Sequence, residues 1–260
     1  MDIVKIVADY FIHSDYNFLV TSNVGFPPPE KNTIVFLTGN ERNTYPINLP
    51  KTKLLFAGFF GQEKRGKMHY LPIGVPKHFN NISNLNLKPI KDRDLNMFYC
   101  GCKHANRGNF FQAFNKVAEE VPNCLLKTTP RNNPQKEMID ENPEDYMNFD
   151  SYWSNLCNTK IHPICINKTT SHDNYRYFES VYAGTINVMA EKNVRKNIWI
   201  YDYPMNVFID SWKDLTPSFV NDIIARYDDF DINWAIDEYK KKLSKHSLAS
   251  YVIETIEENE

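Results

Sequence analysis

Hydrophobic residues in the first 90 positions occur in short runs that are separated by polar or proline-containing segments. Runs rich in β-branched and aromatic residues between turn-forming residues are typical of β-strands. The predicted strands here are Ile3–Val7, Thr33–Thr38 and Lys53–Phe59, with Phe18–Val20 as a short fourth strand. Prolines keep residues 68–76 extended. The polar, Asn- and Lys-rich segment Asn80–Asp94 is interpreted as a linker.

After this linker, apolar strand patterns alternate with amphipathic helix patterns. The predicted strands are Met97–Gly101, Cys124–Lys127, Ile161–Ile166, Thr185–Ala190 and Asn197–Tyr201. The predicted helices are Asn109–Val121, Tyr152–Cys157, the segment that ends at Ala183, Trp212–Asp214, Thr216–Tyr227 and Ile232–Glu257. Such alternation favours parallel sheets with helices on both faces. The sequence therefore predicts an α/β protein of two small Rossmann-like domains that face a cleft, residues 1–90 and 95–227, followed by C-terminal helices in residues 228–260.

Composition narrows the classes of function. The chain has 260 residues, 42% of them hydrophobic and 24% charged, with a formal net charge of -2. This balance is typical of a globular protein and argues against nucleic-acid binding through bulk electrostatics. The 5 cysteines are an odd number without a CxxC pair, so we expect reduced thiols and a cytoplasmic location. Neither a signal peptide nor an apolar run of about 18 residues is seen, so we expect no membrane span.

A helix beginning near Asn174 carries the most informative polar pattern. Arg176, Glu179 and Ala183 are spaced i, i+3 and i+7, so they share one face, and Gly184 follows where a helix commonly ends. An arginine presents a fork of donors that suits a diphosphate, and a carboxylate can accept hydrogen bonds from a ribose diol. The alternative is an i,i+3 surface ion pair, which the spacing alone supports equally.

Two loops could complete such a site. Gly101 stands where a strand ends, and Lys103 and Arg107 follow it closely, so the backbone and both cations could contact a phosphate. The alternative is a basic, solvated surface loop.

The second loop comes between the strand 161–166 and the Arg176 helix. Ser171, His172 and Asn174 are its candidate hydrogen-bond donors toward a sugar or diphosphate. For Asn174, capping of the helix is the simpler explanation.

The segment Arg176-Tyr-Phe-Glu179-Ser-Val-Tyr-Ala183-Gly184-Thr-Ile-Asn-Val resembles the donor-nucleotide signature of exostosin-like glycosyltransferases. The resemblance covers roughly residues 95–215, and Asn187 stands where that family usually has proline. It implies a GT-B fold, with residues 1–90 on the acceptor side and residues 95–227 binding a nucleotide-sugar. It further implies that Glu179 holds the ribose and that Arg176 and Arg107 hold the diphosphate of a UDP-sugar.

An inverting transfer needs a general base at the acceptor hydroxyl. Our first choice is Glu41, which follows the strand 33–38, as the proposed catalytic glutamate does in the similar α1,3-fucosyltransferases. The rival candidates are Asp15, Asp9, His13 and His78. An equally simple alternative for Glu41 is a cap or an ion pair with a nearby arginine.

Neither Asp-x-Asp pair, Asp92–Asp94 or Asp229–Asp231, directly follows an apolar strand, so we expect no essential metal and no cofactor. Together with these residues, the resemblance implies an inverting, metal-independent glycosyltransferase that moves a sugar from a UDP-sugar, with UDP-xylose as a guess, to an oligosaccharide or glycoprotein. Short exostosin-like proteins without a membrane anchor occur in viruses and bacteria, so the resemblance implies a viral or bacterial source. In the viral case we expect the protein in the host cytoplasm. The alternatives are a GDP-fucose-dependent fucosyltransferase and an inactive glycan- or nucleotide-binding protein of the same fold.

Overall fold

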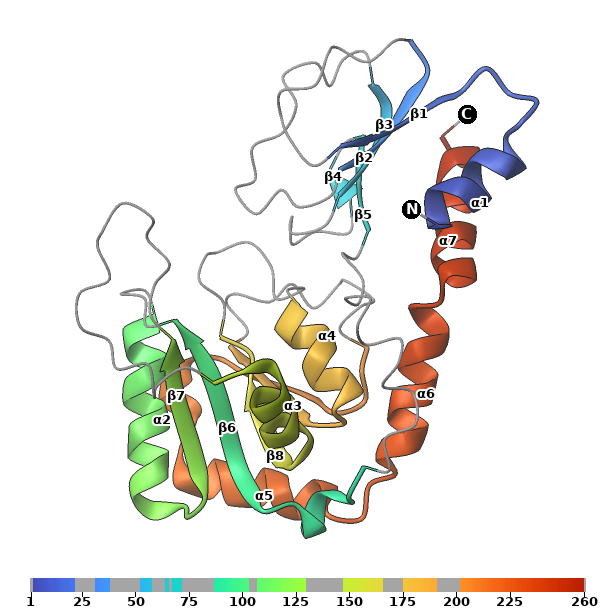
Figure 1. The fold of residues 1–260 in the computed structure, drawn as a ribbon. Coiled ribbons are helices and arrows are strands. Elements are labelled where there is room, and N and C mark those ends of the chain that lie inside the picture. The colour runs from blue at the N-terminus through green and yellow to red at the C-terminus, as the bar shows by residue number, and fades with distance from the viewer. Residues whose placement is uncertain are drawn as a thin grey trace.

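The computed structural model describes residues 2–21, 31–37, 52–57, 64–65, 67–71, 87–102, 107–129, 147–165, 175–190 and 202–259. Within these residues the chain forms two five-stranded sheets whose strands are almost all parallel, each packed against helices (Figure 1). The predicted α/β class, with two sheet-and-helix units, is therefore confirmed. The GT-B-like arrangement and the cleft that we expected between the units stay predictions.

The first sheet has the order β1-β2-β3-β5-β4. Its strands are β1 (Asn17–Thr21), β2 (Thr33–Leu37), β3 (Thr52–Ala57), β4 (Lys64–Arg65) and β5 (Met68–Tyr70). Only β4 runs antiparallel, against β5. The residues of β2 are all buried, which is why this strand reads as a continuous apolar run.

The first element of the chain differs from the prediction. Residues Ile3–Val7, predicted as a strand, belong to the helix α1 (Asp2–Tyr10). Val7 is fully buried in one core with Phe36 of β2 and Phe56 of β3, so α1 packs one face of the first sheet. Ile3 and Val7 are spaced i, i+4, the helical spacing that the strand interpretation overlooked.

The second sheet is wholly parallel, in the order β10-β9-β8-β6-β7. Its strands are β6 (Leu95–Cys102), β7 (Cys124–Thr129), β8 (Thr159–Pro163), β9 (Ile186–Ala190) and β10 (Asn206–Ile209). Its helices are α2 (Gly108–Glu120), α3 (Phe149–Cys157), α4 (Tyr175–Tyr182) and α5 (Pro217–Tyr227), with short 3₁₀ turns at Ile90–Asp92 and Trp212–Asp214. The arrowheads of β6 and β7 point toward the side on which the first unit lies (Figure 1).

Alternate residues of β6 show that helices cover both faces of this sheet. Tyr99 packs its ring against Phe110 of α2, with ring centroids 4.6 Å apart. Phe98 points the other way, toward Tyr152 of α3, at 5.9 Å. A strand that is buried on both faces in this way is expected in a parallel sheet.

The strand β10 was not predicted, and the predicted strand Asn197–Tyr201 lies outside the described residues. A buried polar network explains how β10 joins β9. The Asn187 backbone N–H donates to the carbonyl of Met205 at 2.9 Å, and its side-chain amide donates to Asn206 at 3.2 Å. The Thr185 hydroxyl donates to the Asn187 amide oxygen, and Asn206 in turn donates to the Tyr177 hydroxyl of α4. Asn187, the departure from the exostosin pattern, therefore makes a strand-to-strand bond that proline cannot make.

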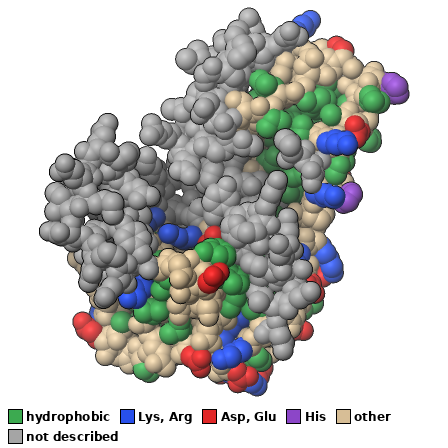
Figure 2. All heavy atoms as spheres, viewed as in Figure 1, with side chains coloured by type: hydrophobic (Ala, Val, Ile, Leu, Met, Phe, Trp, Pro, Cys, Tyr) green, Lys and Arg blue, Asp and Glu red, His purple; other side chains and the backbone are tan. Residues whose placement is uncertain are grey.

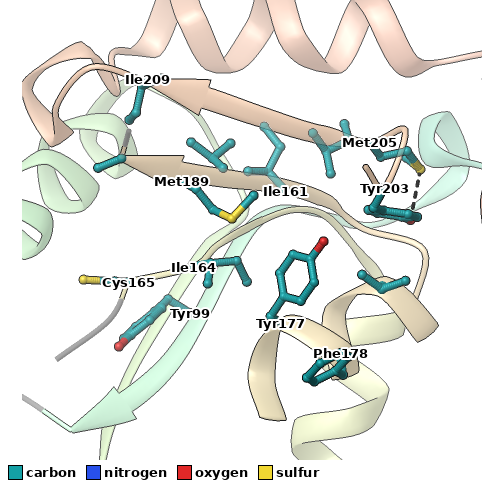
Figure 3. Close-up of a cluster of buried hydrophobic side chains, with 14 of the residues drawn as sticks. Tyr99, Ile161, Ile164, Cys165, Tyr177, Phe178, Met189, Tyr203, Met205 and Ile209 are labelled. Carbon is teal, nitrogen blue, oxygen red and sulfur yellow. Dashed lines mark hydrogen bonds between the residues drawn. The ribbon is translucent and has the colours of Figure 1, made fainter. Parts of the chain in front are cut away.

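Figure 3 shows the buried hydrophobic side chains between α4 and the second sheet. Tyr177 projects from α4 toward the strands, and the Tyr203 hydroxyl contacts the Met205 sulfur at 3.3 Å. These side chains are all buried, so α4 is held against the sheet along its apolar side.

The C-terminal residues form two helices where one was predicted. The helix α6 (Ile232–Lys242) packs on the second unit, whereas α7 (Lys245–Glu257) packs beside α1 on the first (Figure 1). Ser244 separates them and caps α7 by accepting a hydrogen bond from the Ser247 N–H. The Tyr10 hydroxyl donates to Glu257 at 2.7 Å, which ties the ends of α1 and α7 together.

On the face drawn in Figure 2, acidic and basic side chains of the second unit are interspersed. Hydrophobic side chains gather on the first unit, where Tyr10, Ile12 and Val20 are among the exposed apolar residues. Among the described residues, none of the helices has the length and apolarity that crossing a membrane requires.

Candidate functional site

The candidate site lies at the carboxyl edge of the second sheet, where β6 ends and α4 begins. Gly101 is the next-to-last residue of β6, and Arg176 is in the first turn of α4. A Cβ atom placed on Gly101 would lie 2.5 Å from Nη1 of Arg176 and 2.8 Å from the Tyr99 hydroxyl oxygen. The guanidinium therefore rests directly against the backbone of β6, and only glycine leaves it that space.

The environment of Arg176 keeps it charged. Burial lowers its pKa, but the net direction is upward because Tyr99, Tyr152 and Cys100, which ionise in the range where arginine titrates, and the Glu179 carboxylate all raise it. The guanidinium also lies 5.8 Å from the centroid of the Tyr99 ring. Arg176 is thus a fixed cation at the end of a buried strand.

Arg107 lies at the same edge of the sheet. It immediately precedes α2, and only 7% of its surface is exposed. Burial raises the pKa of the Cys165 thiol, just beyond β8, to about 12, whereas Arg107 and Arg176 both act to lower it. The two arginines that the sequence nominated for a diphosphate thus stand at the starts of α2 and α4, and the charges of both act on the same thiol.

Glu179 lies one turn after Arg176 and is held from a different helix. The Tyr152 hydroxyl of α3 donates to Oε2 of Glu179 at 2.7 Å. Burial and the neighbouring carboxylate raise the pKa of Tyr152 well above its usual value, so the hydroxyl stays protonated and remains a donor. The α4 helix then ends as predicted, at Gly184 with a φ of 63°.

His162 is a buried component that sequence reasoning did not nominate. It is fully buried in β8, and its Nδ1 lies 2.9 Å from the carbonyl oxygen of Phe98, which assigns the proton to Nδ1. Burial first, and Arg176 second, lower its pKa to about 3. The His162 imidazole is therefore neutral, and the positive charge at the carboxyl edge of the second sheet comes from the arginines.

Tyr99, Tyr152 and His162 were all missed. Tyr99 is two residues before Gly101 and so shares its face of β6, a spacing that the sequence did offer. Tyr152 and His162 reach the site only because β8 pairs with β6, and no local sequence pattern predicts this pairing.

Several nominated residues lie outside the described residues. They are Glu41, His78, Lys103, Ser171, His172 and Asn174. Their roles stay predictions.

The rival base Asp15 does not follow a strand, the position that we predicted for Glu41. It precedes β1, at the amino end of that strand, and accepts a hydrogen bond from Asn32 at 2.6 Å. Asp9 lies in α1, and His13 lies in the turn that follows this helix, not in a loop after a strand. The argument from strand ends therefore applies to none of these three residues.

Both Asp-x-Asp pairs have structural partners. Asp94 accepts from the Asn158 amide at 2.7 Å, and Asp229 pairs with Lys91 at 2.8 Å. Asp231 caps α6 by accepting from the Trp234 N–H at 3.0 Å. Among the residues that the structure describes, no group of three or more His, Cys, Asp or Glu side chains could hold a metal ion.

Comparison with known proteins gives little beyond this geometry. No protein-family model matches the chain, and no curated protein matches it. Among solved structures it is similar to BGT of T4 phage, a β-glucosyltransferase solved in complex with UDP and Mn²⁺, with a TM-score of 0.45 and 11% sequence identity over 98% of this chain and 93% of that chain. The residues of the site, and not this likeness, therefore carry the functional proposal.

Proposed function

We propose that this protein is a glycosyltransferase that binds a nucleotide-sugar at the carboxyl edge of its second sheet. The observation that supports this best is the placement of Arg176 against Gly101, with Glu179 one helical turn away and Arg107 at the start of α2. Ligands of parallel α/β sheets bind at the carboxyl ends of the strands. A nucleoside diphosphate offers two anionic phosphates to the arginines and a ribose diol to the carboxylate.

In the proposed mechanism, Arg107 and Arg176 stabilise the negative charge that develops on the diphosphate as it leaves the sugar. Two fixed guanidinium groups balance one charge on each phosphate, so we propose a metal-independent, inverting transfer. Glu41 remains our proposed general base, with the domain of residues 1–90 supplying the acceptor side and residues 95–227 the donor side. The resemblance to exostosin-like enzymes favours a UDP-sugar as donor.

Thermal unfolding with added nucleotides tests the donor site. UDP, GDP, UDP-xylose, UDP-glucose, UDP-N-acetylglucosamine and GDP-fucose are each added without metal, and then with manganese. A ligand at 100 times its dissociation constant adds roughly 2.7 kcal/mol to the free energy of unfolding, which raises the melting temperature by a few degrees. We expect the rise with UDP species and without metal. A rise with GDP species alone would favour the fucosyltransferase, and no rise with any of them would overturn the proposal.

Turnover is tested separately, because a binding protein of this fold would pass the first test. The donor that stabilises the protein most is incubated with glycan acceptors, and release of the nucleoside diphosphate is measured. Binding without release in the presence of any acceptor would favour the inactive alternative.

A further inference from the structure

We propose that Tyr152 is the positioning residue of the donor site: it holds Glu179 in the orientation in which the carboxylate accepts hydrogen bonds from a ribose. This inference rests on the proposed function and adds a residue to it that neither the motif nor any local pattern contains. Tyr152 touches Glu179 and not, in this proposal, the ligand itself.

The Tyr152 hydroxyl is itself firmly placed. Its ring packs against Phe98 of β6 with centroids 5.9 Å apart, and α3 is fixed at its start by the Asn148 side chain, which accepts from the Ser151 N–H at 2.8 Å. The donor therefore comes from a helix that is anchored independently of α4. A hydrogen bond of 2.7 Å from such a donor fixes the side-chain torsions of the acceptor.

Glu179 needs this restraint because of its neighbour on the helix. Arg176 is spaced i,i+3 from it, and opposite charges at this spacing attract. A carboxylate that turned toward Arg176 would neutralise the cation that the phosphates require and would turn away from the ribose. The Tyr152 hydroxyl holds Oε2 on the side of α3 instead. This one contact keeps the carboxylate available for the ribose and the Arg176 guanidinium available for the phosphates.

The protonation of Tyr152 makes the restraint permanent under ordinary conditions. Burial, together with the Glu179 carboxylate, raises its pKa well above the usual range, so the hydroxyl donates throughout the pH range of an enzyme assay. Because an ionised carboxylate can only accept, the Tyr152 hydroxyl is the donor in this pair, and the hydrogen bond has one direction.

The test compares two ligands that differ only in the ribose hydroxyls. Affinities of UDP and 2′,3′-dideoxy-UDP are measured by calorimetry for the wild-type protein and for Tyr152→Phe, which keeps the packed ring. We expect Tyr152→Phe to weaken UDP about tenfold more than it weakens dideoxy-UDP, because only UDP also loses a charge-assisted hydrogen bond from the ribose. Equal weakening of both ligands would overturn the proposal, since it would mean that the variant disturbs the site as a whole.

Two further variants guard against misfolding as the cause. Tyr227→Phe removes a hydroxyl that donates to the Pro204 carbonyl at 3.3 Å, away from the site, and should leave both affinities unchanged. In a Glu179→Ala background, Tyr152→Phe should cost nothing more, because the acceptor of its hydrogen bond is already gone. Additive losses would overturn the positioning role. If the wild-type protein binds neither UDP nor GDP, the proposed function itself fails, an outcome distinct from UDP binding that Tyr152→Phe does not change.

Discussion

Replacing Gly101 by alanine should displace Arg176 without unfolding the protein. The added Cβ would lie 2.5 Å from Arg176 Nη1 and 2.8 Å from the Tyr99 hydroxyl, and both distances are far below van der Waals contact. Both atoms are at the ends of side chains, so they can move while the strand stays in place. A normal contact of about 3.5 Å would require the guanidinium to shift by roughly 1 Å.

A shift of this size is enough to break a charge-assisted hydrogen bond to a phosphate. Such a bond contributes about 1.5–3 kcal/mol, so UDP affinity should fall by about 10- to 150-fold. The free energy of unfolding should change by no more than about 1 kcal/mol, because alanine also reduces the entropy of the unfolded chain. Calorimetric titration with UDP measures the affinity, and urea unfolding measures the stability.

Two controls separate this effect from a general disturbance. Gly108→Ala makes the same change where an added Cβ meets nothing within 4 Å, so UDP affinity should be unaffected. Uridine, which has no phosphates, should bind wild-type protein and Gly101→Ala equally. If Gly101→Ala binds UDP as wild-type protein does, Arg176 does not hold the phosphates from its position against β6, and the reasoning is refuted.

Three other perturbations have defined outcomes. Arg176→Ala should weaken donor binding by about 1.5–3 kcal/mol in the same titration, and unchanged affinity would remove α4 from the site. Asn187→Pro deletes the N–H that donates to the Met205 carbonyl and should lower the free energy of unfolding by about 1–3 kcal/mol. An unchanged urea midpoint would show that β10 does not depend on this hydrogen bond. The folded-state pKa of His162 is about 3 against a usual 6.5, so the unfolded state binds the proton first as the pH falls. Stability should therefore decrease by about 1.4 kcal/mol per pH unit between about pH 6.5 and about pH 3. This part of the slope should be absent in His162→Gln, and parallel pH profiles of the two proteins would contradict the assigned neutral state.

Much of the second unit was predictable because its signals are local. Gly184 ends α4, and Thr216 caps α5 by accepting from the Phe219 N–H, so the helix boundaries follow from the chemistry of single residues. Arg176 and Glu179 were recognisable because the spacing on one helix carries the information. These predictions required no knowledge of which strands are neighbours.

Two of the errors have a different physical origin, whereas the α1 helix and Tyr99 were missed although the local spacing was present. The strand β10 is a four-residue edge strand. Its attachment depends on a hydrogen bond between Asn187 and Met205, which lie too far apart in the sequence for a local pattern to show it. Tyr152 meets Glu179 only because α3 and α4 come together over the folded sheet. Tertiary packing, and not local propensity, decides both cases.

The position of α7 has a consequence for how the protein is made. Ala249, Val252 and Ile256 of this helix complete the core cluster that contains Val7 and Phe36, yet the ribosome adds them after every strand of both sheets. Domains usually fold in the order of their synthesis. Here the second sheet can pack while translation continues, whereas the first keeps one apolar face uncovered until α7 emerges. The earliest part of the chain is thus expected to be among the last to become stable, and chaperones would meet it in that interval.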